Sequence, residues 1–288
     1  MQISWRYIIG FLAILVSLTW LAVLSLPDQN LHVVACDVGQ GDGILLTYKS
    51  SQVLIDSGPG NKIVDCLSRH IPFWDREIEL AILTHPQLDH YGGFAQVFRR
   101  YKVDTFLANS LDSSSSAYKA LKEEVAKQKL KIINPMQSMI LRVGLIDIEV
   151  LSKDDEGGGV LGAFDSKIDP NEFSIITKIS FADFDGLFTG DMPKYISDRI
   201  ADQIKLNGYN HIEYLKVPHH GSKNGLSEGL LRSANFKIAV ISAGRRNRYG
   251  HPHKDSLDLL QKYGLKIFRT DEQGDVEVVS DGKSWKVR

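Results

Sequence analysis

Residues 84–93, Thr-His-Pro-Gln-Leu-Asp-His-Tyr-Gly-Gly, follow the apolar run Leu80–Leu83, which predicts a buried strand. His85, Asp89 and His90 therefore fall in one short turn where a strand ends. Imidazole nitrogens and a carboxylate in such a turn can hold a divalent ion, and such an ion lowers the pKa of bound water to about 7. Because the three residues are so close in the sequence, they favour a metal site over isolated structural histidines. The pattern indicates a metallohydrolase.

Two later segments offer further ligands at strand ends. Gly190 permits a tight turn and Asp191 stands before a predicted helix, where a helix N-cap is the alternative interpretation. Farther on, a strand ends at Pro218 and is followed by His219 and His220. Adjacent side chains of an extended backbone point to opposite sides, so at most one of these histidines is expected to be a ligand.

A basic segment precedes the last histidine motif, Gly250-His-Pro-His253. It contains Arg245, Arg246 and Arg248. A run of charge is usually a solvated surface, but guanidinium groups also bind phosphate oxygens in a bidentate manner. The sequence leaves both interpretations open.

Composition limits the remaining choices. With 288 residues, of which 43% are apolar, the chain can form one catalytic domain with a full core. A net charge of -1 excludes the overall basic excess of a protein that coats nucleic acid, so an anionic substrate must be held by local charge. Cys36 and Cys66 form no metal-finger pattern and are expected to be buried free thiols. The glycine-rich stretch 154–162 is expected to be a flexible loop.

The uncharged apolar run Tyr7–Leu26 has the length of a membrane span, because a helix of this size rises about 30 Å. An uncleaved anchor is favoured over a cleaved signal peptide because Val23-Leu24-Ser25 is a poor cleavage site, and a buried core helix is the third alternative. Arg6 before the run places the catalytic domain outside the cytoplasm. We expect a single-pass protein of the cell membrane, with an anchor or signal segment over 1–28 and a hydrolase domain over 29–288.

Short β-rich runs and helical stretches are interleaved after the apolar run, which predicts a sheet sandwich covered by helices on its outer faces. Helices are expected at 94–101, 113–130 and 193–206. Strands are expected at 31–36, 44–48, 53–55, 146–151, 174–181, 186–188, 212–217, 238–242, around 267, 276–279 and 285–287.

Seven motifs, in this order, resemble the metallo-β-lactamase-like domain of ComEC-type DNA-uptake proteins from about residue 31 to the C-terminus. They are Asp37-Val-Gly-Gln-Gly-Asp42, Leu54-Ile-Asp-Ser-Gly58, the histidine segment 84–93, Asn171-Glu-Phe-Ser174, Thr189-Gly-Asp191, His219-His-Gly-Ser222 and Gly250-His-Pro-His253. The resemblance implies a mixed α/β (α+β) fold, an αββα four-layer sandwich with its metal site at the loops along one edge of the two sheets.

The resemblance also implies roles for individual residues. The implied metal ligands are His85, Asp89, His90, Asp191 and His219, and the residues implied to support them are Asp56, Gln87 and His220. Gln87 stands where the superfamily often has a second histidine. No histidine lies between His90 and Asp191, and Asn171-Glu-Phe-Ser174 falls there instead. One tight and one loose divalent ion are therefore expected, with zinc or manganese as the metal.

The leading hypothesis is a membrane-anchored nuclease that hydrolyses DNA phosphodiesters outside the cytoplasm and is related to DNA uptake. Asp89 or Asp191 would orient the nucleophile, and His251 or His253 would protonate the leaving oxygen or contact phosphate. The substrate contacts expected are Arg245, Arg246, Arg248, Lys216, Ser222 and Lys223.

Two alternatives stay open. One is a small-molecule metallohydrolase that acts on a lactone, a β-lactam or a cyclic phosphodiester. The other is a DNA-binding module with a weakened metal site. A single apolar run cannot form a channel, so a role in uptake would require a separate channel protein as partner. The oligomeric state is left open.

Overall fold

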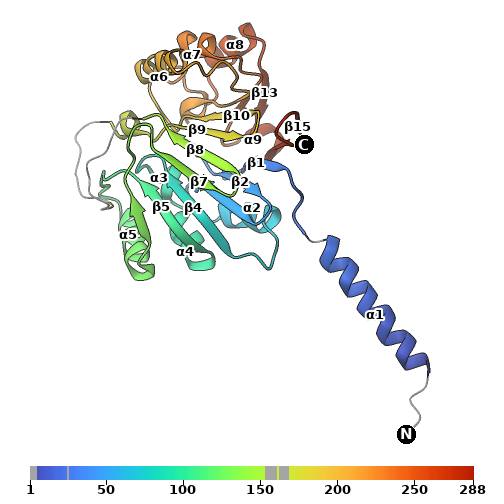
Figure 1. Cartoon of the computed structure of the whole chain (residues 1–288). Coiled ribbons are helices and arrows are strands. Elements are labelled where there is room, and N and C mark those ends of the chain that lie inside the picture. The colour runs from blue at the N-terminus through green and yellow to red at the C-terminus, as the bar shows by residue number, and fades with distance from the viewer. Residues whose placement is uncertain (1–4, 25, 153–160, 162–168) are drawn as a thin grey trace.

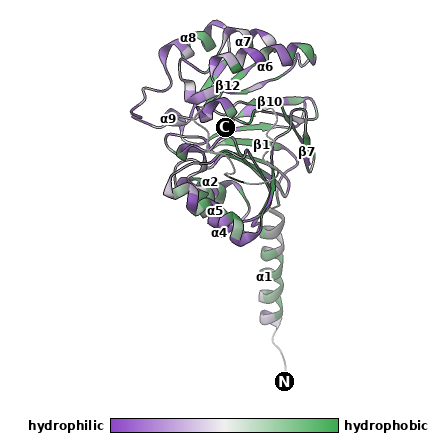
Figure 2. Ribbon diagram, turned by 90° about the vertical axis from the view of Figure 1, so that its left-hand side faces the viewer, coloured by the Kyte–Doolittle hydropathy of each residue, from purple (hydrophilic) through white to green (hydrophobic). Residues whose placement is uncertain are grey.

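The computed structural model describes residues 5–24, 26–152, 161 and 169–288. The expected flexible loop at 154–162 therefore lies, apart from Leu161, outside the described residues. Helix α1 (Trp5–Leu24) begins the described chain, and Figure 1 shows it apart from the sheets. In Figure 2, green hydrophobic segments of α1 alternate with paler ones. The expected membrane-spanning helix is not found, because no helix within these ranges has both the length and the apolar character to cross a membrane.

The first sheet has the strand order β15-β14-β1-β2-β3-β4-β5-β6. Its middle strands β1, β2 and β3 are antiparallel, whereas β3, β4, β5 and β6 run parallel to one another. All of β2 is buried, as expected for a strand that is covered on both faces. The bounds are β1 (Leu31–Ala35), β2 (Ile44–Tyr48), β3 (Ser51–Ile55), β4 (Glu77–Leu83), β5 (Lys102–Ala108), β6 (Lys131–Ile133), β14 (Val276–Ser280) and β15 (Trp285–Val287).

The second sheet has the order β13-β12-β11-β10-β9-β8-β7. Its β10, β11, β12 and β13 are parallel, and β7, β8 and β9 form an antiparallel meander that joins β10. The bounds are β7 (Ile140–Val143), β8 (Ile146–Val150), β9 (Thr177–Phe181), β10 (Phe184–Phe188), β11 (Tyr214–Lys216), β12 (Ile238–Ile241) and β13 (Lys266–Arg269).

Helices cover the outer face of each sheet (Figure 1). The first sheet packs against α2 (Lys62–His70), α4 (Phe94–Arg100) and α5 (Ser116–Gln128), and the second against α6 (Lys194–Leu206), α7 (Glu228–Ser233) and α8 (Lys254–Lys262). In α6, Ile196, Ile200 and Ile204 recur every four residues and are buried, which gives the helix one apolar face. The remaining short helices are α3 (Leu88–Tyr91), α9 (Thr270–Gln273), η1 (Pro170–Phe173) and η2 (Pro218–Gly221).

Three apolar clusters separate the layers. One lies between the sheets and includes Leu46, Ile82 and Phe188, and the other two lie between each sheet and its helices. The mixed α/β sandwich predicted from the sequence is therefore confirmed.

The two cysteines are bonded to each other, so the expectation of free thiols was wrong. Cys36 follows β1, Cys66 lies on the buried face of α2, and their Cα atoms are 5.9 Å apart. This separation lies in the usual range for a disulfide. In the sequence, both cysteines have apolar neighbours, which predicts that they are buried. Their pairing depends on how α2 packs against the sheet, and no local sequence pattern predicts that packing.

Parallel strands place the site at one edge of the sandwich. Asp56 follows β3 and the histidine segment 84–93 follows β4, both in the first sheet, whereas Asp191, His219 and His220 follow β10 and β11 of the second. Because the carboxyl ends of neighbouring parallel strands lie at the same edge, loops from both sheets converge there.

Candidate metal centre

Four buried polar atoms at this edge belong to two groups of donors that share His90. They are His85 Nε2, His90 Nε2, Asp191 Oδ1 and His220 Nε2, and none has a hydrogen-bond partner within the described part of the chain. An unpaired buried polar atom costs about 1–3 kcal/mol. Several such atoms in one place therefore call for a cation that would bind them together.

The spacing of the donors suits a divalent ion. His220 Nε2 lies 3.4 Å from Asp89 Oδ2 and 3.4 Å from Asp191 Oδ2, and His90 Nε2 lies 3.4 Å from Asp191 Oδ2. Ligands about 2.1 Å from a tetrahedral ion are separated from one another by about 3.4 Å. The groups Asp89, His90, His220 and His85, His90, Asp191 each offer ligand atoms within 4.8 Å of one another. The residues present therefore fit a divalent metal.

Asp56 fixes the orientation of His90. Its Oδ2 accepts from His90 Nδ1 at 2.7 Å and from Thr84 Oγ1 at 2.7 Å, and its Oδ1 accepts from the Thr84 backbone at 2.8 Å. These bonds leave His90 Nε2 as the atom that faces the centre, which is how a carboxylate behind a ligating histidine sets its tautomer. Asp56 has a φ of 58°, a left-handed conformation of the kind found at functional sites.

His85 presents a lone pair. Burial, followed by the nearby charge of His90, lowers the pKa of His85 to about 3. Its ring is therefore neutral at physiological pH, the protonation state that a metal ligand needs.

Asp191 lies between the histidines. Gly190 has a φ of 49°, and a Cβ there would come within 3.1 Å of Ser174 and Thr84. Burial would raise the pKa of Asp191, but His220 and His90 outweigh burial and hold it well below the usual carboxyl value. The N-cap interpretation does not hold, because the cap position of α6 is occupied by Pro193.

His220 reaches the centre through an unusual backbone turn. His219 and His220 in η2 both have left-handed φ values, 49° and 52°. His220 is buried and its Nδ1 lies 3.0 Å from the Ser242 carbonyl oxygen and 3.2 Å from Asp42 Oδ1. Burial would lower the pKa of His220, but Asp191 and Asp42 raise it well above its usual value.

His219, the ligand that the resemblance implies, lies farther out. Its side chain is 28% exposed, and its Nε2 is 3.8 Å from Asp191 Oδ2. From the alternation of side chains along an extended backbone, the sequence predicted that at most one of the two histidines is a ligand. It did not indicate which one. The structure brings His220 into the ligand groups, and the left-handed turn that does so has no local sequence signature.

The two departures from the superfamily pattern are neighbours in space. Gln87 Nε2 donates to Asn171 Oδ1 at 3.1 Å. Asn171 lies in η1, within the segment that replaces the mid-chain histidine, and is buried. The side of the centre near His85 therefore has amide groups where imidazoles were to be expected.

Lys216 does not contribute to a positive surface, contrary to the expectation. Its side chain is buried, and its Nζ lies 2.7 Å from Asp42 Oδ2 and donates to the Val217 carbonyl oxygen at 3.0 Å. It neutralises Asp42 inside the protein and cannot reach a substrate. Burial would raise the pKa of Asp42, but Lys216 and His220 outweigh it and lower that pKa.

His251 and His253 occupy different positions. The His251 ring centroid is 5.7 Å from that of His219 and 6.3 Å from that of His220. Burial, with smaller effects from His220 and His219, lowers the pKa of His251 to about 4. His253 instead caps α8, where its Nδ1 accepts from the Asp255 backbone at 3.2 Å.

The expected substrate contacts are mostly at the surface. Arg245, Arg246, Arg248 and Lys223 are exposed, and Arg245 Nε donates to the Asp271 carbonyl oxygen at 3.2 Å. Ser222 is buried, and its Oγ accepts from the Asn224 backbone at 3.3 Å. Ser222 is thus occupied in holding its own turn.

The sequence did not single out Asp42, which faces His220, Thr84, which bonds to Asp56, or Asn171, which bonds to Gln87. Each of the three lies within one of the seven motifs, so the motifs contain a signal for them that does not distinguish one residue from its neighbours.

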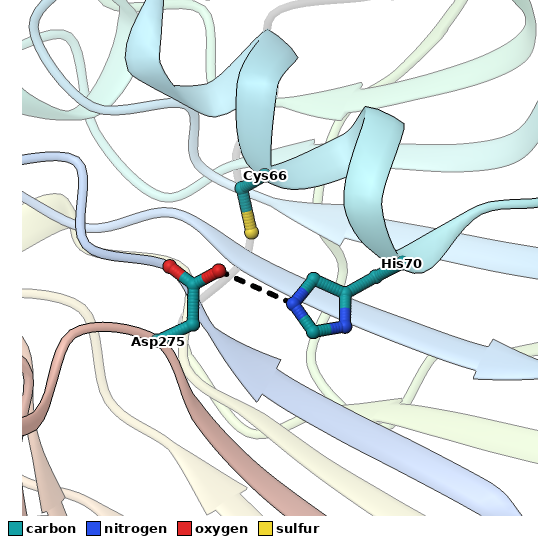
Figure 3. Close-up of side chains that lie close together, drawn as sticks. All are labelled: Cys66, His70 and Asp275. Atoms are coloured by element: carbon teal, nitrogen blue, oxygen red, sulfur yellow. Dashed lines mark hydrogen bonds and ion pairs between the residues drawn. The ribbon is translucent and has the colours of Figure 1, made fainter.

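A second cluster, Cys66, His70 and Asp275, also brings metal-type donors together (Figure 3). The Cys66 sulfur is bonded to Cys36 and has no thiolate to offer. His70 Nε2 lies 3.2 Å from Asp275 Oδ2, and Arg69 donates to the same oxygen at 2.6 Å. This cluster ties α2 to the chain before β14.

The sequence profile described as the metallo-beta-lactamase superfamily matches residues 36–245. The ComE operon protein 3 of Bacillus subtilis is 26% identical over 267 residues, covering 84% of this chain and 32% of that protein. Recombination protein 2 of Haemophilus influenzae is 26% identical over 280 residues, covering 93% of this chain and 31% of that protein. The chain spans about a third of the length of the curated relatives it matches.

Among solved structures, the metallo-beta-lactamase fold protein YhfI from Bacillus subtilis superposes with a TM-score of 0.57. It is 12% identical, and the match covers 86% of this chain and 99% of that one. At this identity the likeness supports the fold alone.

Proposed function

The chain belongs to the metallo-β-lactamase superfamily, as its resemblance to the domain of ComEC-type proteins predicted, and from this premise we propose that it is a metal-dependent nuclease. It has the metallohydrolase fold of that superfamily and is related to competence proteins. The observation that carries the proposal is the cluster of buried donors about 3.4 Å apart, with the exposed arginines of residues 245–248 on a loop at the same edge.

We propose Asp89, His90, Asp191 and His220 as the residues that hold a tight ion. His85 and Asp191 would hold a second ion more loosely, because Gln87 and Asn171 bond to each other nearby. Mixed oxygen and imidazole ligation suits zinc or manganese. The implied role of His219 as a ligand remains a prediction.

A divalent ion at this centre supplies Lewis-acid chemistry, because it makes water nucleophilic near neutral pH and offsets negative charge on phosphate. Asp89 is the partly exposed carboxylate of the cluster, and it would orient the attacking water. The low pKa of His251 leaves its ring neutral, so it would contact phosphate through a hydrogen bond, whereas Arg246 and Arg248 would hold the phosphate backbone by charge.

We further propose that the domain works outside the cytoplasm, in DNA uptake and with a separate channel protein. The buried Cys36–Cys66 disulfide supports an oxidising compartment, since cytosolic thiols are kept reduced. The name of a third relative, competence protein ComA of Neisseria gonorrhoeae, supports the link to uptake.

The test is metal-dependent cleavage of single-stranded and double-stranded DNA by the full chain with zinc or manganese. An Asp89→Asn, Asp191→Asn double variant is compared with Asp202→Asn, a control on the exposed face of α6. Cleavage by the unchanged chain and the control, but not by the double variant, supports the nuclease. Turnover of a lactone or a β-lactam without DNA cleavage would replace this proposal with a small-molecule hydrolase. DNA binding without turnover of any substrate would leave a binding module.

A further inference from the structure

A groove of about 530 Å³ opens beside Asp89. One wall comes from the loop after β1, one from the turn after β4 that contains Leu88 and Asp89, and one from the loop after β12. Its lining includes Gln40, Leu88, Asp89, Arg248 and Tyr249. Because Asp89 belongs both to the groove and to the metal centre, whatever occupies the groove is adjacent to the reacting group.

The first two walls are locked together. Asp42 N donates to the Asp89 carbonyl oxygen at 3.1 Å, and Gly41 packs so closely that a Cβ there would lie 2.2 Å from the same oxygen. Across the groove, Gly244 N donates to Gln40 Oε1 at 3.1 Å. The groove is therefore built by the fold and needs no rearrangement to exist.

The third wall presents Tyr249 in a defined position. Asn247 holds the loop, because its Oδ1 accepts from the backbones of Tyr249 at 3.1 Å and His251 at 3.0 Å, while its Nδ2 donates to the carbonyl oxygens of Gly244 and His251. Tyr249 remains 54% exposed, and Leu88 on the neighbouring wall remains 49% exposed.

A row of rings connects Tyr249 to the centre. Tyr249 lies nearly parallel to His251, with centroids 5.7 Å apart, and His251 lies 5.7 Å from His219. The Arg248 guanidinium is 5.1 Å from the Tyr249 ring centroid. A flat apolar group in the groove would thus lie against a lining that includes an aromatic ring, a guanidinium group and the proposed ligand Asp89.

We propose that this groove binds the nucleobase next to the scissile phosphate, with Tyr249 and Leu88 against the base, so that the substrate is single-stranded DNA or an unpaired end. The inference rests on the nuclease function proposed above and names its substrate class. A paired base has neighbours on both faces and its edge in a base pair, so it cannot enter. Aromatic stacking accepts every base, because every base has a π face, and the arginines hold the charged backbone.

The experiment measures binding of the full chain with EDTA present, so that cleavage does not interfere. The probes are a fluorescent single strand, the same strand with abasic sites, and a blunt duplex. Tyr249→Ala is expected to weaken binding of the single strand by about tenfold and to change binding of the abasic strand little. Tyr249→Phe, which keeps the ring, restores affinity for the single strand. Phe73→Ala is the matched control, since Phe73 is 78% exposed on the loop before β4.

The base subsite is overturned if Tyr249→Ala loses as much affinity for the abasic strand as for the intact strand. It is also overturned if the unchanged chain binds the single strand and the blunt duplex with equal affinity. If the unchanged chain still cleaves DNA with metal, the nuclease function survives that result. If the unchanged chain neither binds nor cleaves DNA, both proposals fall together.

Discussion

Lys216 Nζ lies 2.7 Å from Asp42 Oδ2, and both side chains are buried. Asp42 in turn faces Nδ1 of His220, whose Nε2 points at Asp89 and Asp191. An internal ion pair thus stands directly behind a proposed ligand and helps to fix its orientation.

Replacing Lys216 with methionine should remove the lysine partner of the buried Asp42 charge and leave His220 to face it. The expected loss is about 3–5 kcal/mol of unfolding free energy, measured by urea denaturation. The double variant Asp42→Asn, Lys216→Met should recover part of it, and Lys205→Met on the exposed side of α6 should change little. A Lys216→Met protein as stable as the unchanged chain would contradict the role given to this pair.

Metal analysis distinguishes the two adjacent histidines. His220→Ala should weaken the tight ion by more than about 100-fold, because it removes a buried donor 3.4 Å from two carboxylates. His219→Ala should weaken it by less than about tenfold, because its ring is partly exposed and farther from Asp191. Equilibrium dialysis with zinc or manganese gives both affinities. The reverse order would return the ligand role to His219.

Reduction of the disulfide should lower stability without changing the fold. Cys36 and Cys66 are separated by 30 residues, and closing a loop of this size contributes about 3.6 kcal/mol. The midpoint of urea unfolding should therefore fall when dithiothreitol is added. A Cys36→Ala, Cys66→Ala variant should have the lower midpoint already and should not respond to the reductant.

The free energy of unfolding should fall at acid pH as Asp275 becomes protonated. Burial raises its pKa, but bonds from His70 and Arg69 outweigh burial and hold it below the usual value. A carboxyl group with a lowered folded pKa contributes stability that is present above the unfolded pKa of about 3.9 and is lost as pH falls through the folded value. Asp275→Asn should therefore lower the urea midpoint at pH 7, and its difference from the unchanged chain should shrink below about pH 4. A difference that stays constant down to pH 2 would show that the charge of Asp275 is not involved.

The exposed arginines should act on polynucleotides in a salt-dependent way. Arg246→Ala, Arg248→Ala should reduce the slope of log affinity against log salt for single-stranded DNA by about one for each phosphate that the arginines no longer neutralise. Hydrolysis of bis(p-nitrophenyl) phosphate should fall less than DNA binding, because this small ester does not extend along the loop. Arg100→Ala, on the exposed end of α4, serves as the control. Equal losses on both substrates would argue against backbone binding by these residues.

Much of the fold could be predicted because many of its strands and helices follow from local sequence patterns. The span of β2 follows from its run of aliphatic, β-branched and aromatic residues, and α6 follows from isoleucines at positions 196, 200 and 204. The strand-end clusters at His85 and Asp191 also meet at one edge, as parallel strand ends must. Such predictions depend only on side-chain period and on the direction of the strands.

What could not be predicted depends on distance across the chain or on backbone angles. The bond between Cys36 and Cys66 requires the docking of α2, a short helix without a side-chain cap. The orientation of the His220 side chain toward Asp89 and Asp191 follows from two consecutive left-handed residues. The position of His253 as the N-cap of α8 depends on where that helix begins, which the motif Gly250-His-Pro-His253 does not show.

The loop around Tyr249 takes its shape largely from bonds to one of its own residues, Asn247. The proposed metal ligands are held separately, by Asp56, Asp42 and the strand ends. Preference for a substrate can therefore drift, or be engineered by loop grafting, while the reactive machinery is inherited unchanged. A scaffold divided in this way would be expected to give rise to descendants that share one chemistry and differ in what they recognise.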